Sequence, residues 1–223
     1  MTCMQTFEID LTRYRIIDLS YEVVPPGTQD RPFLIERGHL ADRAFKHAVA
    51  THSHVGTHVE APAHFFEGGK DVCDLPLSQF LGRAVLLDVP EAKVAMAIGP
   101  EYLGRAIGDI IQVGDIVICR NRDPESLRSS RPEDKPCFVP AGARWLAERQ
   151  VKMLGIDGQF RLGKDIEDGR ALHDILQSQD VCLVEFLDNL SALSQRQFFF
   201  MALPWKVRKM DSSWARAIAI EAK

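Results

Sequence analysis

The chain has 223 residues, 46% of them hydrophobic and 26% charged, and its 27 basic and 31 acidic side chains leave a net charge of −4. This composition is typical of one folded globular domain over residues 1–223, and it excludes a disordered, collagen-like or disulfide-stapled chain, since the five cysteines include no CxxC pair. Scattered basic residues argue against a nucleic-acid partner, and the lack of a long apolar segment or a signal-peptide pattern argues against a membrane partner, so we expect a cytoplasmic protein.

The first half of the chain alternates apolar segments with turn-rich ones. Residues 16–20 predict a strand, which proline and glycine at residues 25–32 should end. Residues 44–59 mix valine, threonine and histidine, which favours a strand that runs into a loop. The other elements expected in this half are a helical turn near residue 76, buried strands at 84–89 and 114–119, and a short helix at 100–106.

The second half has a helix-then-strand rhythm. Residues 121–136 are rich in charge, serine and proline, which indicates a surface excursion or a mobile loop. The basic residues Lys206, Arg208 and Lys209 are expected on a solvated strand edge. Apolar spacing then predicts helices at 140–149 and 171–177 and strands at 151–157, 181–185, 198–207 and 215–220. Together the elements predict a compact α/β domain built on mixed sheets.

Histidine is concentrated in one short segment that ends at His64. Side chains alternate between two faces of an extended chain, so His54, His58 and Glu60, which are separated by even steps, would project to the same side. Two imidazoles and a carboxylate suit a borderline cation such as Zn²⁺ or Mn²⁺ and leave coordination positions open for water. Pro62 should end the strand, so that His64 lies beyond it.

Two less specific interpretations compete with an open metal site. Histidines are usually ordinary surface or core residues, and this is the interpretation that we adopt for His39, His47 and His52. A closed structural zinc site would normally recruit thiolates, but the nearest cysteine, Cys73, does not stand at ligand spacing. The pattern of histidine and carboxylate therefore favours an open, catalytic type of site.

The segment from His54 to His64 reads HVGTHVEAPAH, and it resembles the HxGTHxDxPxH pattern of the cyclase family of metal-dependent hydrolases, which includes bacterial kynurenine formamidases and isatin hydrolases. The resemblance continues through FFEGGK at 65–70, GDIV at 114–117, GID at 155–157 and ALP at 202–204, and so covers most of the chain. It implies the compact mixed-sheet swivelling β/β/α fold of that family, and it implies that metal-activated water cleaves a small amide, formamide or cyclic amide.

The resemblance also implies roles for individual residues. In the formamidase branch the remaining metal ligands are a histidine and a glutamate twelve residues apart, and these match His173 and Glu185. His64 would be the proton carrier. The resemblance further implies a homo-oligomer, a dimer or tetramer, that acts on a small-molecule substrate. The implied ligands of one or two divalent ions, Zn²⁺ first and Mn²⁺ second, are His54, His58, Glu60, His173 and Glu185, with Glu60 common to both ions.

Three places depart from the family pattern. Glu60 stands where the family most often has aspartate, and its extra methylene moves the carboxylate outward, which leaves the number, identity and bridging of the metals open. Residues 158–160 read GQF in place of a Thr-Pro-Ser-type turn, and residues 211–214 read DSSW in place of a Gly-Ser-Pro-like stretch. A catalytically silent metal- or ligand-binding scaffold and a metal-dependent lyase or cyclase are therefore alternatives to the hydrolase.

Three aromatic residues near these departures are candidates for the walls of a substrate pocket. They are Phe160, Trp205 and Trp214, and each would suit an aromatic or apolar substrate. Ordinary packing in a core or an interface is the alternative interpretation for all three.

Overall fold

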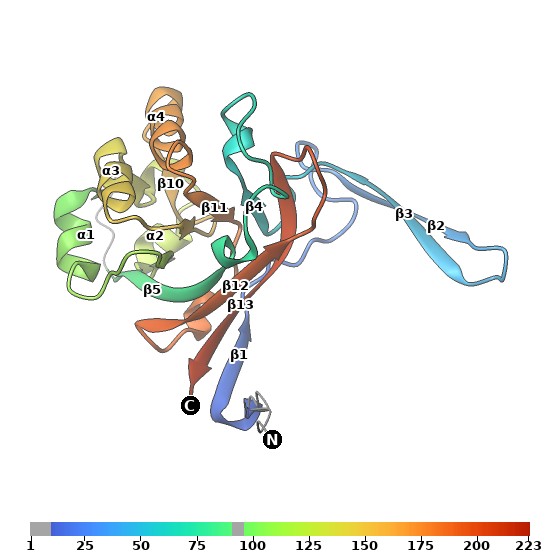
Figure 1. Ribbon diagram of the computed structural model, residues 1–223, viewed down its shortest axis with the longest axis horizontal. Helices are drawn as coiled ribbons and strands as arrows, with labels where there is room; N and C mark the ends of the chain where they lie inside the picture. Colours follow the sequence, from blue (N-terminus) through green and yellow to red (C-terminus); the bar gives the residue numbers. More distant parts are fainter. Residues whose placement is uncertain (1–9, 91–95) are drawn as a thin grey trace, which may run out of the picture.

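A mixed sheet of eight strands, in the order β1-β13-β12-β5-β7-β9-β11-β4, forms the centre of the computed structural model, which describes residues 10–90 and 96–223 (Figure 1). Strand β4 pairs with β13 as well as with β11, so the sheet closes into a barrel, and β1 extends it beside β13. The strands are β1 (Tyr14–Asp18), β4 (His58–Glu60), β5 (Leu81–Val89), β7 (Ile116–Asn121), β9 (Met153–Gly155), β11 (Cys182–Glu185), β12 (Gln197–Pro204) and β13 (Ser212–Ala222).

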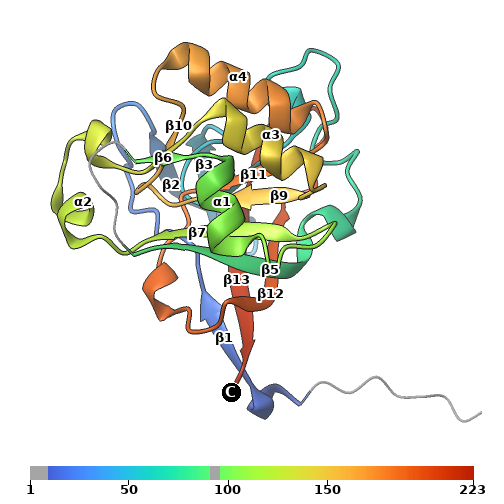
Figure 2. The same cartoon turned by 90° about the vertical axis from the view of Figure 1, so that its left-hand side faces the viewer.

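Four neighbouring strands of the barrel, β5, β7, β9 and β11, run parallel, and the other pairs in the sheet are antiparallel. Parallel neighbours need a crossover connection, which is usually helical. Helices α1 (Pro100–Ile107), α3 (Pro140–Glu148) and α4 (Ile166–Gln177) lie in these three crossovers. Figure 2 shows all three helices over one side of the sheet.

The strands separate two apolar cores, because successive side chains point to opposite faces. On β5, Ala84 and Leu86 belong to a cluster that includes residues from every strand of the closed barrel and so fills its interior. Val85 and Leu87 belong to a second cluster, which includes apolar residues of α1, α3 and α4 and so lies between the sheet and the helices. The mixed α/β fold predicted from the sequence is confirmed.

The smaller elements lie around this barrel. Strands β2 (Phe33–His39) and β3 (Phe45–Thr51) form a two-stranded arm that projects from the body (Figure 1), of which the sequence analysis predicted β3 but not β2. The others are β6 (Ala97–Ile98), β8 (Cys137–Phe138), β10 (Arg161–Leu162), α2 (Pro124–Arg128) and the 3-10 turns η1 (Leu11–Arg13), η2 (Pro62–His64), η3 (Leu77–Gln79), η4 (Pro132–Asp134) and η5 (Leu190–Ala192).

The structure confirms some local expectations and corrects another. Residues 44–59 contain a strand that runs into a loop, as predicted, since β3 ends at Thr51 and a turn separates it from β4. The basic residues Lys206, Arg208 and Lys209 lie in the loop between β12 and β13, so they do not form a strand edge. Residues 121–136 form a surface excursion that contains α2 and η4. Among the described residues, no helix is both long and apolar enough to span a bilayer.

Candidate metal centre

Strand pairing brings two carboxylates and an imidazole to one face of the sheet. Val59 packs into the barrel interior, so its neighbours His58 and Glu60 point to the opposite face. In the antiparallel pair of β4 with β11, Glu185 lies directly across from His58. The motif and a residue more than a hundred positions later therefore share one surface.

His54 reaches this surface from a loop. Residues 52–57 form a turn, in which Gly56 has a φ of +64° and a Cβ atom would lie 2.4 Å from Cγ2 of Val23, so only glycine fits there. The extended alternation predicted from the sequence holds for His58 and Glu60 but is wrong for His54. The turn nevertheless brings Nδ1 of His54 to 3.0 Å from Oε1 of Glu60.

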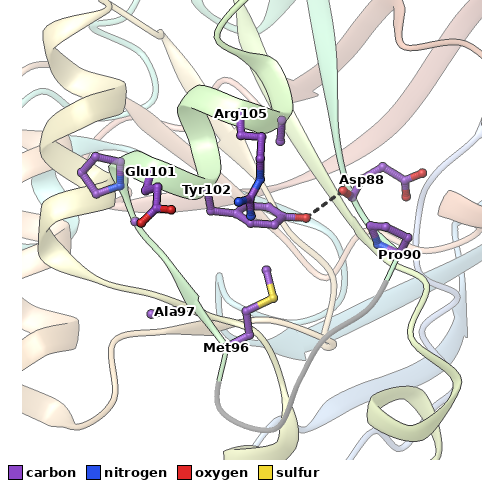
Figure 3. Close-up of a pocket in the computed structure, with 10 residues that line it drawn as sticks. Asp88, Pro90, Met96, Ala97, Glu101, Tyr102 and Arg105 are labelled. Atoms are coloured by element: carbon purple, nitrogen blue, oxygen red, sulfur yellow. Dashed lines mark hydrogen bonds between the residues drawn. The ribbon is translucent and has the colours of Figure 1, made fainter.

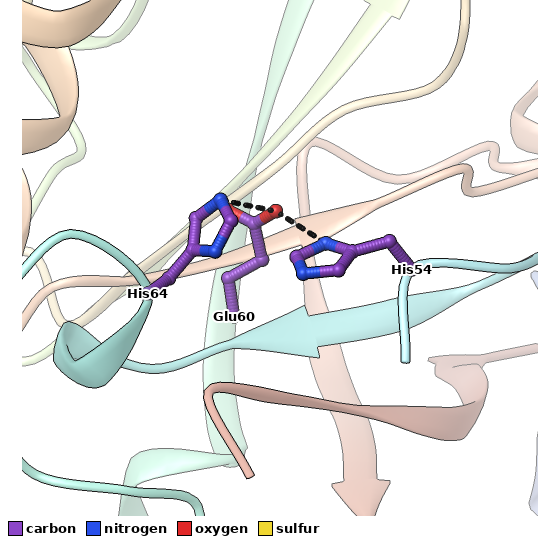
Figure 4. Close-up of side chains that lie close together, drawn as sticks. All are labelled: His54, Glu60 and His64. Carbon is purple, nitrogen blue, oxygen red and sulfur yellow. Dashed lines mark ion pairs between the residues drawn. The ribbon is translucent and has the colours of Figure 1, made fainter. Parts of the chain in front are cut away.

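His64 and His173 approach Glu60 from two further elements. Strand β4 ends at Glu60, and Pro62 then begins the turn η2, which carries His64. Nε2 of His64 lies 3.6 Å from Oε1 of Glu60, and Figure 4 shows His64 and His54 on either side of that carboxylate. Nε2 of His173, on α4, lies 3.7 Å from Oε2 of Glu60.

Backbone carbonyl groups fix the ring orientation of two of these histidines. Nδ1 of His58 lies 2.8 Å from the carbonyl oxygen of Gly56, and Nδ1 of His173 lies 2.7 Å from that of Gly169. A carbonyl oxygen can only accept, so Nδ1 carries the hydrogen in both rings and donates it. Nε2 is therefore the nitrogen left for another partner, and in both rings it faces Glu60.

The carboxylate of Asp211 fixes the ring orientation of the other two histidines. One oxygen of Asp211, Oδ2, lies 2.8 Å from Nε2 of His54 and 2.8 Å from Nδ1 of His64. Those nitrogens donate to the carboxylate, which leaves Nδ1 of His54 and Nε2 of His64 to face Glu60. All four imidazoles thus direct a ring nitrogen at the same carboxylate.

The two glutamates of the cluster have opposite acid–base tendencies. Glu60 is 3% exposed, and burial opposes its ionisation, but interactions with His54 and His58 outweigh burial and hold its pKa well below the usual range. Burial, together with the charge of Glu60, raises the pKa of Glu185 to about 7. Burial also lowers the pKa of His173, which favours the neutral imidazole that a metal requires.

The donor set fits a divalent cation. Oε2 of Glu60 is buried and has no hydrogen-bond partner within residues 10–90 and 96–223, and Nε2 of His173 lies 3.7 Å from it. A buried acceptor of this kind is costly unless a cation satisfies it. Two groups of residues each offer ligand atoms that all lie within 4.8 Å of one another. One group is His54, Glu60 and His64, the other is His58, Glu60 and Glu185, and Glu60 belongs to both.

Comparison with known proteins identifies the family. The model of the family described as "Putative cyclase" matches residues 17–159. The chain belongs to the cyclase family. Its relatives include the kynurenine formamidase of Salinibacter ruber, which is 27% identical over 93% of this chain and 98% of that protein, and the cyclase-like protein 1 of Arabidopsis thaliana, which is 29% identical over 75% of this chain and 66% of that protein.

Solved structures share the cyclase-family fold. Isatin hydrolase A from Labrenzia aggregata, bound to benzyl benzoate, has a TM-score of 0.78 and 21% identity over 95% of both chains. A potential metal-dependent hydrolase with cyclase activity has a TM-score of 0.73 and 23% identity over 94% of this chain and 99% of that one. The names of these relatives agree with the sequence-based prediction of an amide-cleaving metal-dependent hydrolase.

A small cavity of about 190 Å³ lies next to the cluster of histidines and glutamates around Glu60. It is bordered by His173 and Glu185 and, on its other sides, by Asp157, Phe160 and Phe186. Phe160 thus lies where a pocket wall was predicted. The other two predicted wall residues line a different groove, of about 650 Å³, at the base of the arm; they are Trp205 and Trp214, whose ring centroids lie 5.4 Å apart.

Sequence reasoning missed two charged residues beside the cluster. Asp211 was noted only as part of a departure from the family pattern, and nothing in its spacing indicated a contact with His54 or His64. Arg31 donates to the backbone carbonyl of His54, and its guanidinium lies 4.5 Å from the ring centroid of Phe186. It precedes β2 in a turn-rich segment that carries no sequence signal for such a contact.

A larger cavity lies away from the cluster, beside α1 (Figure 3). Its volume is about 920 Å³, and its lining includes Asp88, Tyr102 and Arg105. The hydroxyl of Tyr102 donates to the backbone carbonyl of Asp88 at 3.1 Å. Because Pro90 and Met96, which also line it, flank residues outside the described ranges, we assign this cavity no role.

Asp157 should make stability depend on pH. Burial raises the pKa of its carboxyl group from 3.8 to about 6, so the folded state binds this proton more tightly than the unfolded state. The contribution of Asp157 to stability therefore falls as pH rises from about 4 to above 6. In Asp157→Asn the side-chain oxygen can still accept from the N–H of Gln159, a bond of 2.8 Å, but it no longer titrates.

We expect metal-free Asp157→Asn to be more stable than the wild type by about 1–3 kcal/mol at pH 7, with the difference shrinking as pH falls below 6. Urea unfolding of both proteins between pH 4 and 8 measures this difference directly. A difference that stays constant over that range would contradict the raised pKa.

Proposed function

We propose that this protein is a metal-dependent hydrolase that uses metal-activated water to cleave a small amide, formamide or cyclic amide. One observation carries the proposal: four imidazoles each direct a ring nitrogen at Glu60, a buried carboxylate with an unsatisfied oxygen. Neutral imidazole and carboxylate are the ligands that catalytic zinc sites use. Membership of the cyclase family and the formamidase relatives support the same activity.

We further propose that the site holds one or two divalent ions, with Zn²⁺ preferred and Mn²⁺ second. Nitrogen and oxygen ligands without thiolate suit both metals. When bound, such an ion polarises a carbonyl group and lowers the pKa of a bound water toward neutrality. The residues that would hold it are His54, His58, Glu60, His173 and Glu185. Glu60 belongs to both groups of residues that offer ligand atoms, which supports its role as a ligand common to two ions, whereas His173 belongs to neither group and lies 3.7 Å from Oε2 of Glu60.

His64 is proposed as the proton carrier. Its side chain is 26% exposed, whereas that of His58 is fully buried, so His64 can exchange protons with solvent and substrate. Its Nδ1 donates to Asp211, which holds Nε2 ready to accept or deliver a proton at the site. The alternative is that His64 is itself a ligand, because Nε2 is as close to Glu60 as Nε2 of His58 is, at 3.6 Å.

The cavity beside the cluster favours a small, flat substrate. Its volume of about 190 Å³ is below the usual range for drug-sized ligands, and two of the residues that line it, Phe160 and Phe186, are aromatic. Arg31 packs on the ring of Phe186 and helps to fix that wall. We therefore propose an aryl formamide or a cyclic aryl amide as the substrate class.

For the quaternary structure, we propose a homo-oligomer, a dimer or tetramer, in which the β2–β3 arm contacts a second copy. Ile35 and Val49 face each other across the arm and are 49% and 51% exposed, and Phe45 is 60% exposed. A two-stranded ribbon with exposed apolar side chains is marginally stable by itself in water, which supports packing against a partner. The cytoplasmic location stays a prediction.

Replacement of His58 tests the metal centre. In protein purified without chelators, we expect elemental analysis to find Zn or Mn in the wild type, and we expect His58→Ala to lose both the metal and the turnover of an aryl formamide. His39→Ala, on the arm, is the control that should keep both. A His58→Ala variant with full activity would contradict the proposal, and wild-type protein that takes up no metal after reconstitution would favour the silent scaffold.

Replacement of His64 separates its two roles. If His64 carries the proton, His64→Asn should keep the metal while its turnover falls about 10²- to 10⁴-fold, because general acid–base catalysis typically contributes that much. Loss of metal in the same variant, measured by elemental analysis, would show instead that His64 is a ligand.

Labelled water separates hydrolysis from the lyase or cyclase alternative. Hydrolysis of an amide must place one oxygen atom of the water in the product carboxylate. We therefore expect mass spectrometry to find one ¹⁸O atom in the product formed in H₂¹⁸O. A product free of label, after correction for spontaneous exchange, would rule out hydrolysis.

A charged substitution on the arm tests whether the arm forms the contact between copies of the chain. Ile35→Glu places a carboxylate on the exposed apolar face, so we expect it to lower the molar mass measured by light scattering to that of the monomer. Glu36→Gln changes the neighbouring residue on the opposite face of the ribbon and should leave the mass unchanged. A monomeric wild type, or an Ile35→Glu variant of unchanged mass, would contradict the proposed contact.

A further inference from the structure

Asp211 contacts two of the four imidazoles with the same oxygen atom. Its Oδ2 lies 2.8 Å from Nε2 of His54 and 2.8 Å from Nδ1 of His64. We infer that Asp211 is a positioning residue that determines which ring nitrogen of His54 and of His64 faces Glu60. This inference rests on the proposed function, since it takes the cluster to be a metal centre.

The chain around Asp211 holds its carboxylate in place. Its backbone carbonyl accepts from the N–H of Ala61 at 2.8 Å, directly after β4. The next residue, Ser212, begins β13 and pairs with Glu60 across the two strands. The second carboxylate oxygen, Oδ1, accepts from the hydroxyl of Ser53 at 3.2 Å. The group that orients the two imidazoles is therefore itself fixed from both sides.

Because of Asp211, His54 and His64 present opposite nitrogens. Nε2 of His54 donates to Asp211, so Nδ1, which lies 3.0 Å from Oε1 of Glu60, is the nitrogen that would bind a cation. The hydrogen of His64 is on Nδ1, so its lone pair is on Nε2. A carboxylate behind a ligating histidine fixes its tautomer and ring orientation, and loss of such a partner typically weakens metal binding 10- to 100-fold.

The other two imidazoles provide an internal control. His58 and His173 donate to backbone carbonyl groups, so their orientation does not depend on Asp211. A change at Asp211 should therefore disturb half of the cluster and leave the other half in place. A general loss of structure would disturb all four rings.

Two variants separate positioning from direct coordination. In Asp211→Asn the amide oxygen can take the place of Oδ2 and accept both hydrogen bonds, while the NH₂ group faces the hydroxyl of Ser53. Asp211→Ala removes both acceptors. We expect the Zn²⁺ dissociation constant, measured by competition with a chromophoric chelator, to rise 10- to 100-fold in Asp211→Ala and only a few-fold in Asp211→Asn.

Asp109→Asn, a change at a carboxylate with 66% side-chain exposure, is the matched control and should bind Zn²⁺ like the wild type. Thermal unfolding of each metal-free variant checks that the fold is kept. Equal affinities for the wild type and Asp211→Ala would overturn the inference. An Asp211→Asn variant as weak as Asp211→Ala would overturn it too, because that result would make Asp211 a direct ligand.

The tautomers can be observed directly by ¹⁵N NMR of imidazoles in the Zn²⁺-loaded protein. We expect the hydrogen on Nε2 of His54 and on Nδ1 of His64, and we expect this pattern to disappear in Asp211→Ala while His58 and His173 keep theirs. The opposite tautomer at either His54 or His64 in the wild type would refute the positioning role. Wild-type protein that takes up no Zn²⁺ would instead contradict the proposed function.

Discussion

The burial of Glu60 is the constraint on which the candidate site depends. Its side chain is 4% exposed, and a carboxylate in such a place is unfavourable unless positive or hydrogen-bonding groups surround it. The imidazoles of His54, His58, His64 and His173 provide this environment on several sides. A cation bound among them would satisfy the remaining oxygen of Glu60, so stability of the folded chain and binding of the metal should be coupled.

Closure of the barrel places Glu60 there. The three residues of β4 pair with β11 on one side and β13 on the other, and Val59 anchors the strand in the interior core. A shift of one residue in this register would turn Glu60 into the apolar interior, so packing of Val59 fixes the direction of the carboxylate. The crossover helix α4 then covers the same face and brings His173 to it.

The parts of this arrangement that could be predicted are local in sequence. Alternation along β4 indicated that His58 and Glu60 share a face, apolar runs indicated the buried strands, and the family resemblance supplied His173 and Glu185. The contact of Asp211 with His64 spans 147 residues and follows only from closure of the sheet, which no local pattern encodes. Strand β2 and its pairing with β3 were missed because the exposed faces of a two-stranded ribbon do not show the apolar–polar alternation of a half-buried strand.

The four imidazoles fall into two classes with different sensitivity to mutation. The rings of His58 and His173 are oriented by backbone carbonyl groups, which no single side-chain replacement removes. Those of His54 and His64 are oriented by one carboxylate in the segment before β13. Substitution at that one position can therefore alter the orientation of two of the four imidazoles while the barrel and the two backbone-held rings stay intact, which makes it a place where the chemistry of the site can change without loss of the fold.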